Sequence, residues 1–343
     1  MCQKKRSFCR IRFRGLAALA AALFLLSGGY AARAEESLPT PIPENIRTAD
    51  EIVIDDRYEE LSSYTITFRN MQAYTPEYFN YAKVTATEEL PTPDGREVNR
   101  FRFADDAVLT IPCNTTLEYG NKDFECYRQL LSYMDNANIT PAKQADAPYP
   151  LENAIARCET IFKTLHIDNL VLDQAVALPS DSISNMTDGM KQFYNGTEPV
   201  CFDAFPEEIG VWYLAFRQEL NGIKSLGTPQ VRIALTEKET ALLELDKIID
   251  HINDDYELPA GVCWTDALRV FSASHCGKSG ESYEISKINI AYDYNLMDSN
   301  ALDARAFPCW QIEGQAGGGK FEETYSILDG KEMKHPTSSN VKY

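Results

Sequence analysis

The chain has 343 residues, 44% of them hydrophobic and 24% charged, and a formal net charge of −18 at pH 7. Such an excess of acidic residues repels the phosphates of nucleic acids and of anionic lipids, so we exclude nucleic acid as a partner. A chain of this length can bury one large core or two smaller ones.

Residues 1–34 have the pattern of a secretory signal peptide. A basic stretch precedes the apolar run LAALAAALFLL (16–26), which is too short to span a bilayer with these flanks, and Ala32 and Ala34 suit a cleavage site before residue 35. Residues 1–34 hold seven of the 33 Lys and Arg and no Asp or Glu, so their removal leaves a net charge of −25. We expect a secreted or extracytoplasmic protein of the cell envelope with no membrane insertion after cleavage. An uncleaved N-terminal anchor is the alternative.

The first part of the remaining chain predicts strands. Residues 35–50 are rich in proline and predict an extended linker, and 51–150 predict a β-rich region. Within that region EIVIDD, SYTITF and NRFRFADDAVLTIPC alternate or run apolar, with a hairpin turn at Asp105-Asp106. The segment DFECYRQLLSYM fits a strand or a short helix, and its periodicity does not decide between them.

Two further stretches each combine a helix with following strands. Residues 151–248 begin with LENAIARCETIFKTLHI, whose apolar residues recur at the i, i+3, i+4 spacing of an amphipathic helix. Residues 249–343 contain the helix TDALRVFSASH, with Thr265 as N-cap, and a closing hairpin with a two-residue turn at Asp329-Gly330. We predict an α+β fold of antiparallel sheets, each flanked by an amphipathic helix, in two related modules (151–248 and 249–343). The expected strands are 169–178, 211–220, 230–235, 241–248, 282–296, FPCWQI and the hairpin 321–333.

Seven cysteines lie beyond residue 34, and a compartment outside the cytoplasm favours their pairing. Because seven is an odd number, at least one stays free or pairs between chains. Cys113 and Cys126 flank an expected hairpin and are the first candidate for a bridge, and Cys263 could pair with Cys276 or Cys309. The candidates for disulfides are Cys113, Cys126, Cys158, Cys201, Cys263, Cys276 and Cys309.

Two stretches resemble catalytic motifs without matching them. The glycine run at 314–320 has the spacing of the start of a phosphate-binding loop, but Phe321 stands where Ser or Thr would hold magnesium. We interpret the run as the exit loop of a strand. Cys263-Trp264 before a helix resembles the nucleophile segment of papain-like peptidases, but the distant His and Asn are missing, and His275 lies too far along the same helix to act as a base.

No other group of residues defines a chemical site. The four histidines form no zinc motif and the acidic clusters lack the calcium-loop pattern, so we expect no cofactor, no metal site and no catalytic residue. Paired carboxylates for glycoside cleavage cannot be selected from 51 acidic residues without geometry. Tyr292, Tyr294 and Trp310 could line a ligand groove and form the candidate binding surface, although aromatic residues at alternate strand positions more often belong to a core or a sheet surface.

The C-terminal part resembles a known family. The matching stretches are LENAIARC (151–158), INIAYDY (288–294), FPCWQIEG (307–314) and TYSILDGKEM (324–333), and they are similar to the pattern of the YycH/YycI-type extracytoplasmic regulators of Gram-positive bacteria and related secreted lipoproteins. The resemblance implies PepSY-like α+β modules and a role in contacting membrane sensor kinases rather than in catalysis. The chain departs from the pattern in its cleavable-looking signal and in Gly29, which replaces the lipidated cysteine. Both departures argue against contact with a kinase within the membrane.

These observations predict a non-catalytic protein of the cell envelope that binds another envelope or membrane protein and regulates a membrane sensor. The alternatives are an envelope hydrolase acting on peptide or glycan, and a module that binds a solute or a host surface through the loop 179–209. An open sheet edge would favour a protein partner, whereas a cleft lined by two carboxylates or a Cys–His contact would favour a hydrolase. The sequence does not define the oligomeric state.

Overall fold

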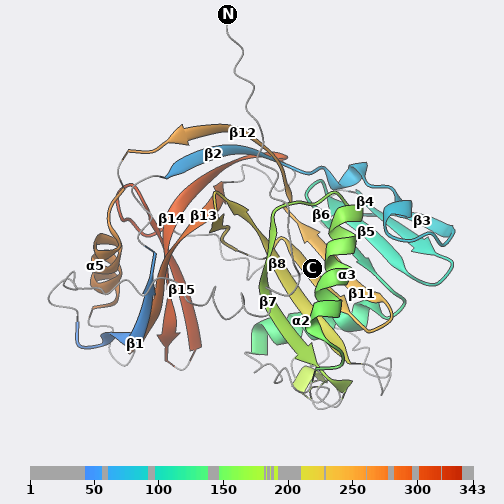
Figure 1. The fold of residues 1–343 in the computed structure, drawn as a ribbon, viewed down its shortest axis with the longest axis horizontal. Helices are drawn as coiled ribbons and strands as arrows, with labels where there is room; N and C mark the ends of the chain where they lie inside the picture. The colour runs from blue at the N-terminus through green and yellow to red at the C-terminus, as the bar shows by residue number, and fades with distance from the viewer. Residues whose placement is uncertain are drawn as a thin grey trace, which may run out of the picture.

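The computed structural model describes residues 43–55, 61–91, 97–137, 147–180, 183, 186, 189–191, 210–227, 229–259, 261–276, 282–295, 301–317 and 319–333. The expected signal peptide, Cys201 and most of the loop 179–209 lie outside the described residues. Within the described residues the chain is α+β and consists mostly of strands in two sheets (Figure 1). The predicted fold class is confirmed at this level.

The first sheet has six strands in the order β1-β13-β14-β2-β12, with β15 added to β14. Strand β14 is long enough to hold two strands end to end on one side, because its residues 303–306 pair with β2 and its residues 309–316 pair with β15. Strand β1 runs parallel to β13, and the other pairs are antiparallel. The strands are β1 (Ile46–Ile54), β2 (Ser62–Phe68), β12 (Ile249–Glu257), β13 (Tyr283–Asn295), β14 (Asp303–Ala316) and β15 (Gly319–Ser326).

The second sheet has nine strands in the order β3-β4-β5-β6-β11-β10-β8-β7, with the short β9 added to β8. All of its pairs are antiparallel. The strands expected between 169 and 248 are confirmed as β7, β8, β10 and β11. The bounds are β3 (Val84–Pro91), β4 (Glu97–Phe103), β5 (Val108–Cys113), β6 (Thr116–Gly120), β7 (Leu170–Leu178), β8 (Val211–Leu220), β9 (Ile223–Lys224), β10 (Val231–Leu235) and β11 (Thr240–Asp246).

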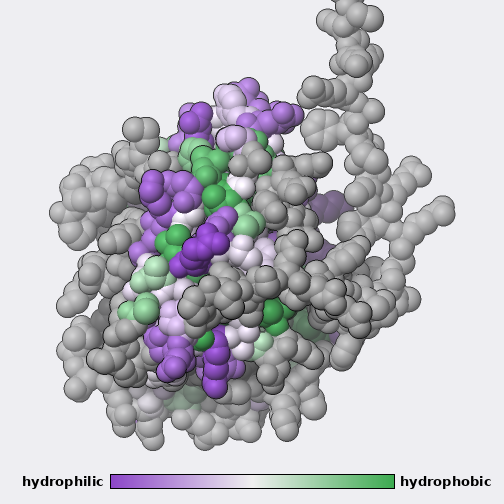
Figure 2. Space-filling view, turned by 90° about the vertical axis from the view of Figure 1, so that its left-hand side faces the viewer, coloured by the Kyte–Doolittle hydropathy of each residue, from purple (hydrophilic) through white to green (hydrophobic). Residues whose placement is uncertain are grey.

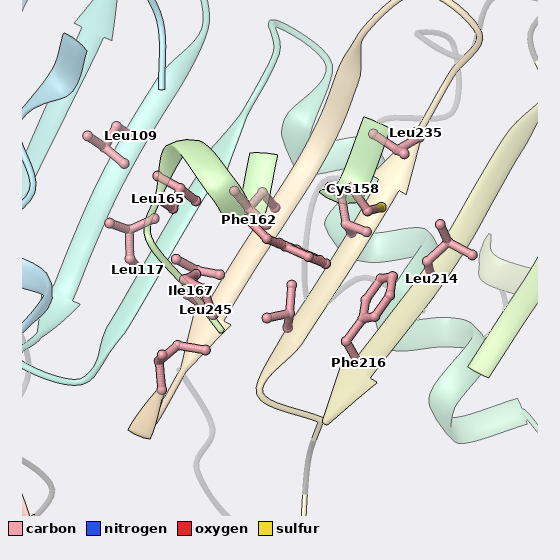
Figure 3. Close-up of a cluster of buried hydrophobic side chains, with 14 of the residues drawn as sticks. Leu109, Leu117, Cys158, Phe162, Leu165, Ile167, Leu214, Phe216, Leu235 and Leu245 are labelled. Carbon is pink, nitrogen blue, oxygen red and sulfur yellow. The ribbon is translucent and has the colours of Figure 1, made fainter. Parts of the chain in front are cut away.

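Two helices, α3 (Leu151–Thr164) and α2 (Phe124–Ala137), pack on opposite faces of the nine-stranded sheet. Alternate side chains of β8 show the two faces, because Phe216 shares a core with α3 and Tyr213 shares a core with α2. Phe162 of α3 meets the ring of Phe216 edge-on, with 4.9 Å between the ring centroids (Figure 3). The apolar spacing therefore predicted α3 correctly, and DFECYRQLLSYM, for which the sequence left two alternatives, forms helix α2.

Helix α5 (Trp264–His275) packs on the six-stranded sheet, where Phe271 lies in the same core as Trp310. The residue before the helix is Cys263, which has extended backbone angles and makes no capping hydrogen bond with its side chain. The expectation of Thr265 as N-cap is therefore wrong. The chain becomes helical one residue earlier than Thr265.

Two glycines of the C-terminal part, Gly317 and Gly330, lie in turns that reverse the chain. Gly314 lies inside β14, and Gly317 (φ 57°) lies in the turn that leads to β15, so the interpretation of a strand followed by its exit turn is confirmed. The expected two-residue Asp-Gly turn further on is wrong. There Gly330 has a positive φ of 69° but the residue before it does not, and the loop is closed by Ser326, whose N–H donates to the carbonyl of Lys331.

Sheet membership does not follow the order of the chain. Strands β1 and β2 lie in the six-stranded sheet with β12 to β15, whereas β3 to β6 lie in the nine-stranded sheet with β7 to β11. The expected β-rich region 51–150 is thus shared between the two sheets, and β1 begins at Ile46, within the expected linker. The modules 151–248 and 249–343 stay predictions, because a sheet assignment does not show which segments fold independently.

Polar side chains join the two sheets. The amide of Gln218 in β8 donates to the carbonyls of Asp168 and Ile249 at 3.1 Å each and accepts from the N–H of Ile249, the first residue of β12, at 2.6 Å. Next to it, the guanidinium of Arg69 after β2 donates to the carbonyl of Leu165 at the end of α3 at 2.7 Å. These bonds place the beginning of β12 where the two sheets meet.

Candidate functional site

The candidate binding surface of aromatic residues lies largely inside the protein. Tyr292 and Trp310 are 0% exposed in the core of the six-stranded sheet, and Tyr294 is partly buried against that core. The Tyr292 hydroxyl donates to the carbonyl of Ser62 at 2.8 Å, and the Trp310 indole N–H donates to the carbonyl of Val262 at 2.9 Å. Because these polar groups are already bonded inside the core, Tyr292 and Trp310 are not presented to a ligand or a partner.

No two of the six described cysteines form a disulfide bond with each other. The candidate bridge between Cys113 and Cys126 is therefore not formed; the first residue ends β5 and the second is buried in the first turn of α2. Cys263 and Cys276 lie at opposite ends of α5, about 18 Å apart along a twelve-residue helix, which is too far for a bridge. The remaining described cysteines, Cys158 and Cys309, are buried, and burial raises the pKa of the Cys158 thiol to about 12 and that of Cys309 well above its usual value.

The thiol of Cys263 is not paired with an imidazole. Its Sγ donates to a carboxylate oxygen of Asp266 at 3.3 Å and lies 2.6 Å from the hydroxyl oxygen of Thr265. His275 lies at the far end of the helix, where its Nε2 is 2.8 Å from a carboxylate oxygen of Glu323. The side-chain contacts of this thiol are therefore with a hydroxyl and a carboxylate, and its helix separates it from His275. Among the described residues no group of three or more His, Cys, Asp and Glu side chains could hold a metal ion.

Two glutamates face each other on neighbouring strands of the nine-stranded sheet. Glu118 of β6 is the direct register partner of Glu244 of β11. Burial, and then the negative charge of Glu244, raise the pKa of Glu118 to about 7. Like charges directly opposite each other destabilise an antiparallel pair, so this arrangement needs compensation from other groups.

The compensation comes from arginines. Arg232 of β10 stands opposite Glu244 and forms an ion pair with it at 2.6 Å. Arg128 of α2 also favours the charged form of Glu118, although it is itself paired with Glu125 of the same helix at 2.9 Å. The two glutamates are thus part of a charged row across the sheet beside α2. No sequence pattern predicts this row, because the pairing of β6 with β11, strands distant in the chain, brings its residues together.

The most exposed element of the described chain is β12. Every residue of this strand except the first is exposed, and Ile252 and Tyr256 are 53% and 45% exposed. Its sequence IDHINDDYE is poor in strand-forming residues, so it is held in place mainly by its neighbour β2 (SSYTITF), which is rich in them. Sequence reasoning missed β12, because a polar strand lacks the alternation of apolar residues that identifies strands.

The backbone of β12 leaves an open edge. Among the described residues β12 pairs with β2 alone. The N–H of Leu258 donates to the carbonyl of Leu61, and the register continues with Tyr256 opposite Ser63. Because successive residues of a strand point their backbone groups to alternate sides, those of Asp255 and Glu257 point away from β2. Such unpaired N–H and C=O groups can accept a further strand.

Charge is concentrated along this edge. The last four residues of β12 include three acidic side chains, those of Asp254, Asp255 and Glu257. Within the described residues none of these three has an ion-pair partner. A positive group nearby, Arg305 of β14, stacks on Tyr256 with 5.5 Å from its guanidinium carbon to the ring centroid. Figure 2 shows hydrophilic side chains at the top of the molecule, at the height of the β2–β12 pair in Figure 1. The edge is therefore acidic as well as open.

Other strands also end a sheet but are less accessible. Strand β7 finishes in three buried residues, and β3 alternates between exposed and partly buried positions. Strand β1 runs parallel to β13, and its register shifts between Thr48 and Val53. We take the β12 edge as the candidate functional site. None of the helices in the described part of the chain is long and apolar enough to cross a membrane.

Comparison with known proteins supports the fold alone. No protein-family model matches the sequence, and no curated protein sequence matches it. The structure is similar to that of an uncharacterized protein from Eubacterium rectale, with a TM-score of 0.54 and 12% sequence identity over 86% of this chain and 92% of that chain. An alignment with the Bacillus megaterium YpeB C-terminal domain has a TM-score of 0.30 and 12% identity over 75% of this chain and 91% of that domain. The second value is too low to support an argument, and the relationship to YycH/YycI-type regulators stays a prediction.

Proposed function

We propose that this chain is a secreted, non-catalytic protein of the bacterial cell envelope that binds another envelope or membrane protein by adding a strand of the partner to the β12 edge. The observation that carries the proposal is a strand exposed along almost its whole length, whose outward backbone groups have no partner among the described residues. Main-chain hydrogen bonds supply affinity in this mode of recognition, and side chains next to the edge supply specificity. Regulation of a membrane sensor is the specific form of this function that the family resemblance favours.

A proline at the edge tests the proposal. Asp255→Pro removes an N–H that points away from β2, and proline is tolerated at such edge positions, so the sheet should remain intact. Asp255→Ala removes the side chain but keeps the N–H and is the matched control. With a photo-crosslinking residue at Ile252 in cells, we expect a partner adduct that Asp255→Pro abolishes and Asp255→Ala retains. Circular dichroism checks that both variants fold.

The identity of the crosslinked partner decides whether the proposed binding function includes regulation of a membrane sensor. Capture of a sensor kinase or of its accessory proteins would support the regulatory role, and capture of another envelope protein would leave the binding function without that role. An adduct that Asp255→Pro does not change would show that the partner uses another surface.

A hydrolase is the competing class, and the Glu118–Glu244 pair is the observation that favours it. A carboxyl group with a pKa of about 7 suits a general acid at neutral pH. Against this, Glu244 is engaged by Arg232. Hydrolysis of wall peptides or glycans by the purified chain, lost in Glu118→Gln, would favour the hydrolase over the binding protein.

A further inference from the structure

The charges beside the open backbone of β12 define the chemistry of its occupant. We infer that the segment held at this edge is an extended stretch of another protein with two lysine or arginine residues placed two positions apart. The inference rests on the proposed function, because it names the occupant of the same edge.

The spacing of the basic residues follows from the geometry of the strand. Asp255 and Glu257 are two residues apart, so their side chains lie on the same face of the sheet, and their backbone groups point outward. Side chains directly opposite each other on paired strands have Cβ atoms about 4.5–5.5 Å apart. A partner strand in register therefore brings every second side chain within reach of one of these two carboxylates.

Neighbouring charges do not neutralise the two carboxylates. Asp250 at the start of β12 is already paired with Arg69, and Arg305 is held against the rings of Tyr256 and Phe307 at 5.5 Å each. Within the described residues Asp255 has no such counterpart, nor has Glu257. A basic partner would supply the missing counter-ions.

The same charges exclude a second copy of this chain as the occupant. Pairing of β12 with another β12 would bring Asp254, Asp255 and Glu257 of both copies together along one edge. Like charges that face each other across paired strands are destabilising, and charged side chains on an edge strand hinder its pairing with a second copy. The edge thus accepts a basic segment and rejects its own copy.

Two synthetic peptides of ten residues test the inference. Both alternate valine and threonine; one carries lysine at two positions two apart, and the other carries glutamate there. Binding to the isotope-labelled chain from residue 35 onward is followed by NMR titration and by the hydrogen-exchange protection of the Asp255 and Glu257 amides. We expect the lysine peptide to bind at least tenfold more tightly than the glutamate peptide, to protect these amides, and to weaken as salt is raised.

Charge reversal at the edge provides the decisive comparison. In Asp255→Lys/Glu257→Lys the preference should switch to the glutamate peptide. In the control Glu159→Lys/Glu237→Lys, which changes the net charge equally at exposed positions on α3 and in the β10–β11 turn, the preference should persist. Equal binding of both peptides, or loss of preference in the control as well, would overturn the inference.

The proline variant separates this result from failure of the proposed function. If Asp255→Pro abolishes binding of both peptides while charge reversal changes nothing, strand addition stands and the charge inference is wrong. If Asp255→Pro leaves binding unchanged, or if neither peptide protects the two amides at millimolar concentration, the occupant is not an added strand and both proposals fail. Dimerisation through β12 in analytical ultracentrifugation would also overturn the exclusion of a second copy.

Discussion

Gly314 occupies a position in β14 where a side chain has no room. A Cβ atom there would lie 2.1 Å from the carbonyl oxygen of Glu284 and 2.7 Å from a ring carbon of Phe321. It lies beside the point where the register of β13 and β14 shifts, between Ile285 and Lys287. The close approach of two backbones at this bulge is what requires glycine.

We expect Gly314→Ala to lower the free energy of unfolding by about 2 kcal/mol or more, because the clash is with backbone and cannot be relieved by a side-chain rotation. The matched control is Gly319→Ala in the same hairpin, where the nearest atom to an added Cβ is 3.8 Å away. Urea denaturation monitored by tryptophan fluorescence measures both. Equal stability losses in the two variants would show that the close contact with Glu284 is not what constrains this position.

Single residues also show the limit of sequence reasoning. The alternation of Ile288, Ile290 and Tyr292 predicted strand β13 correctly, since a period of two is a local property. It did not show whether a second layer covers that face, and in the structure α5 shares the core in which Tyr292 and Trp310 are buried. Whether a sheet face is covered depends on contacts between distant segments. The sequence alone therefore does not show that Tyr292 and Trp310 of the candidate binding surface are buried.

At the scale of elements, the pairing of β6 with β11 buries a titratable carboxyl group, that of Glu118, opposite a second carboxylate, that of Glu244. The pKa of Glu118, raised to about 7, lies above the ordinary value of 4.5 that it has in an unfolded chain. The folded chain therefore keeps a proton on Glu118 that the unfolded chain releases. The stability from this protonated form is fully present below pH 4.5 and is lost as the pH rises through about 7.

Glu118→Gln removes the charge and keeps the shape. We expect the variant to be more stable than the unchanged protein at pH 8 by about 1–3 kcal/mol, and the difference to shrink toward pH 4.5. Thermal unfolding of both proteins between pH 4.5 and 8 measures it, and taking the difference cancels other titrating groups. A difference that does not change with pH would show that Glu118 titrates normally in the folded chain.

The elements that the sequence predicted are those with local signals. Helix α3 has a clear apolar stripe, and β8 and β13 have runs of strand-forming residues. Strand β12 has no such signal, because most of its residues are polar. It is extended because it pairs with β2, about 190 residues earlier in the chain. Sequence patterns therefore do not predict the candidate site. They do allow the general expectation that an open sheet edge would favour a protein partner.

At the scale of the whole molecule, the arrangement of the sheets depends on contacts between distant parts of the chain. Strand β1 pairs with β13, and β2 separates β14 from β12 in the six-stranded sheet. Gln218, on β8 of the nine-stranded sheet, is buried and bonds to both backbone groups of Ile249, where the chain enters β12. This side chain, together with Arg69, therefore links the nine-stranded sheet to the first residues of the candidate binding edge.

We expect Gln218→Met to lower the free energy of unfolding by about 1–3 kcal/mol, because it leaves the partly buried carbonyls of Asp168 and Ile249 and the N–H of Ile249 without this partner. The control Gln174→Met, at an exposed position on neighbouring β7, should change stability by less than about 0.5 kcal/mol. If Gln218 couples the sheets, calorimetry should resolve one transition in the unchanged protein and two in Gln218→Met, and the amides of β12 should exchange faster. A single transition at a lower temperature would instead mean that Gln218 stabilises the fold without being the coupling element, which would leave that role to the Arg69 bonds to Leu165 and Asp250.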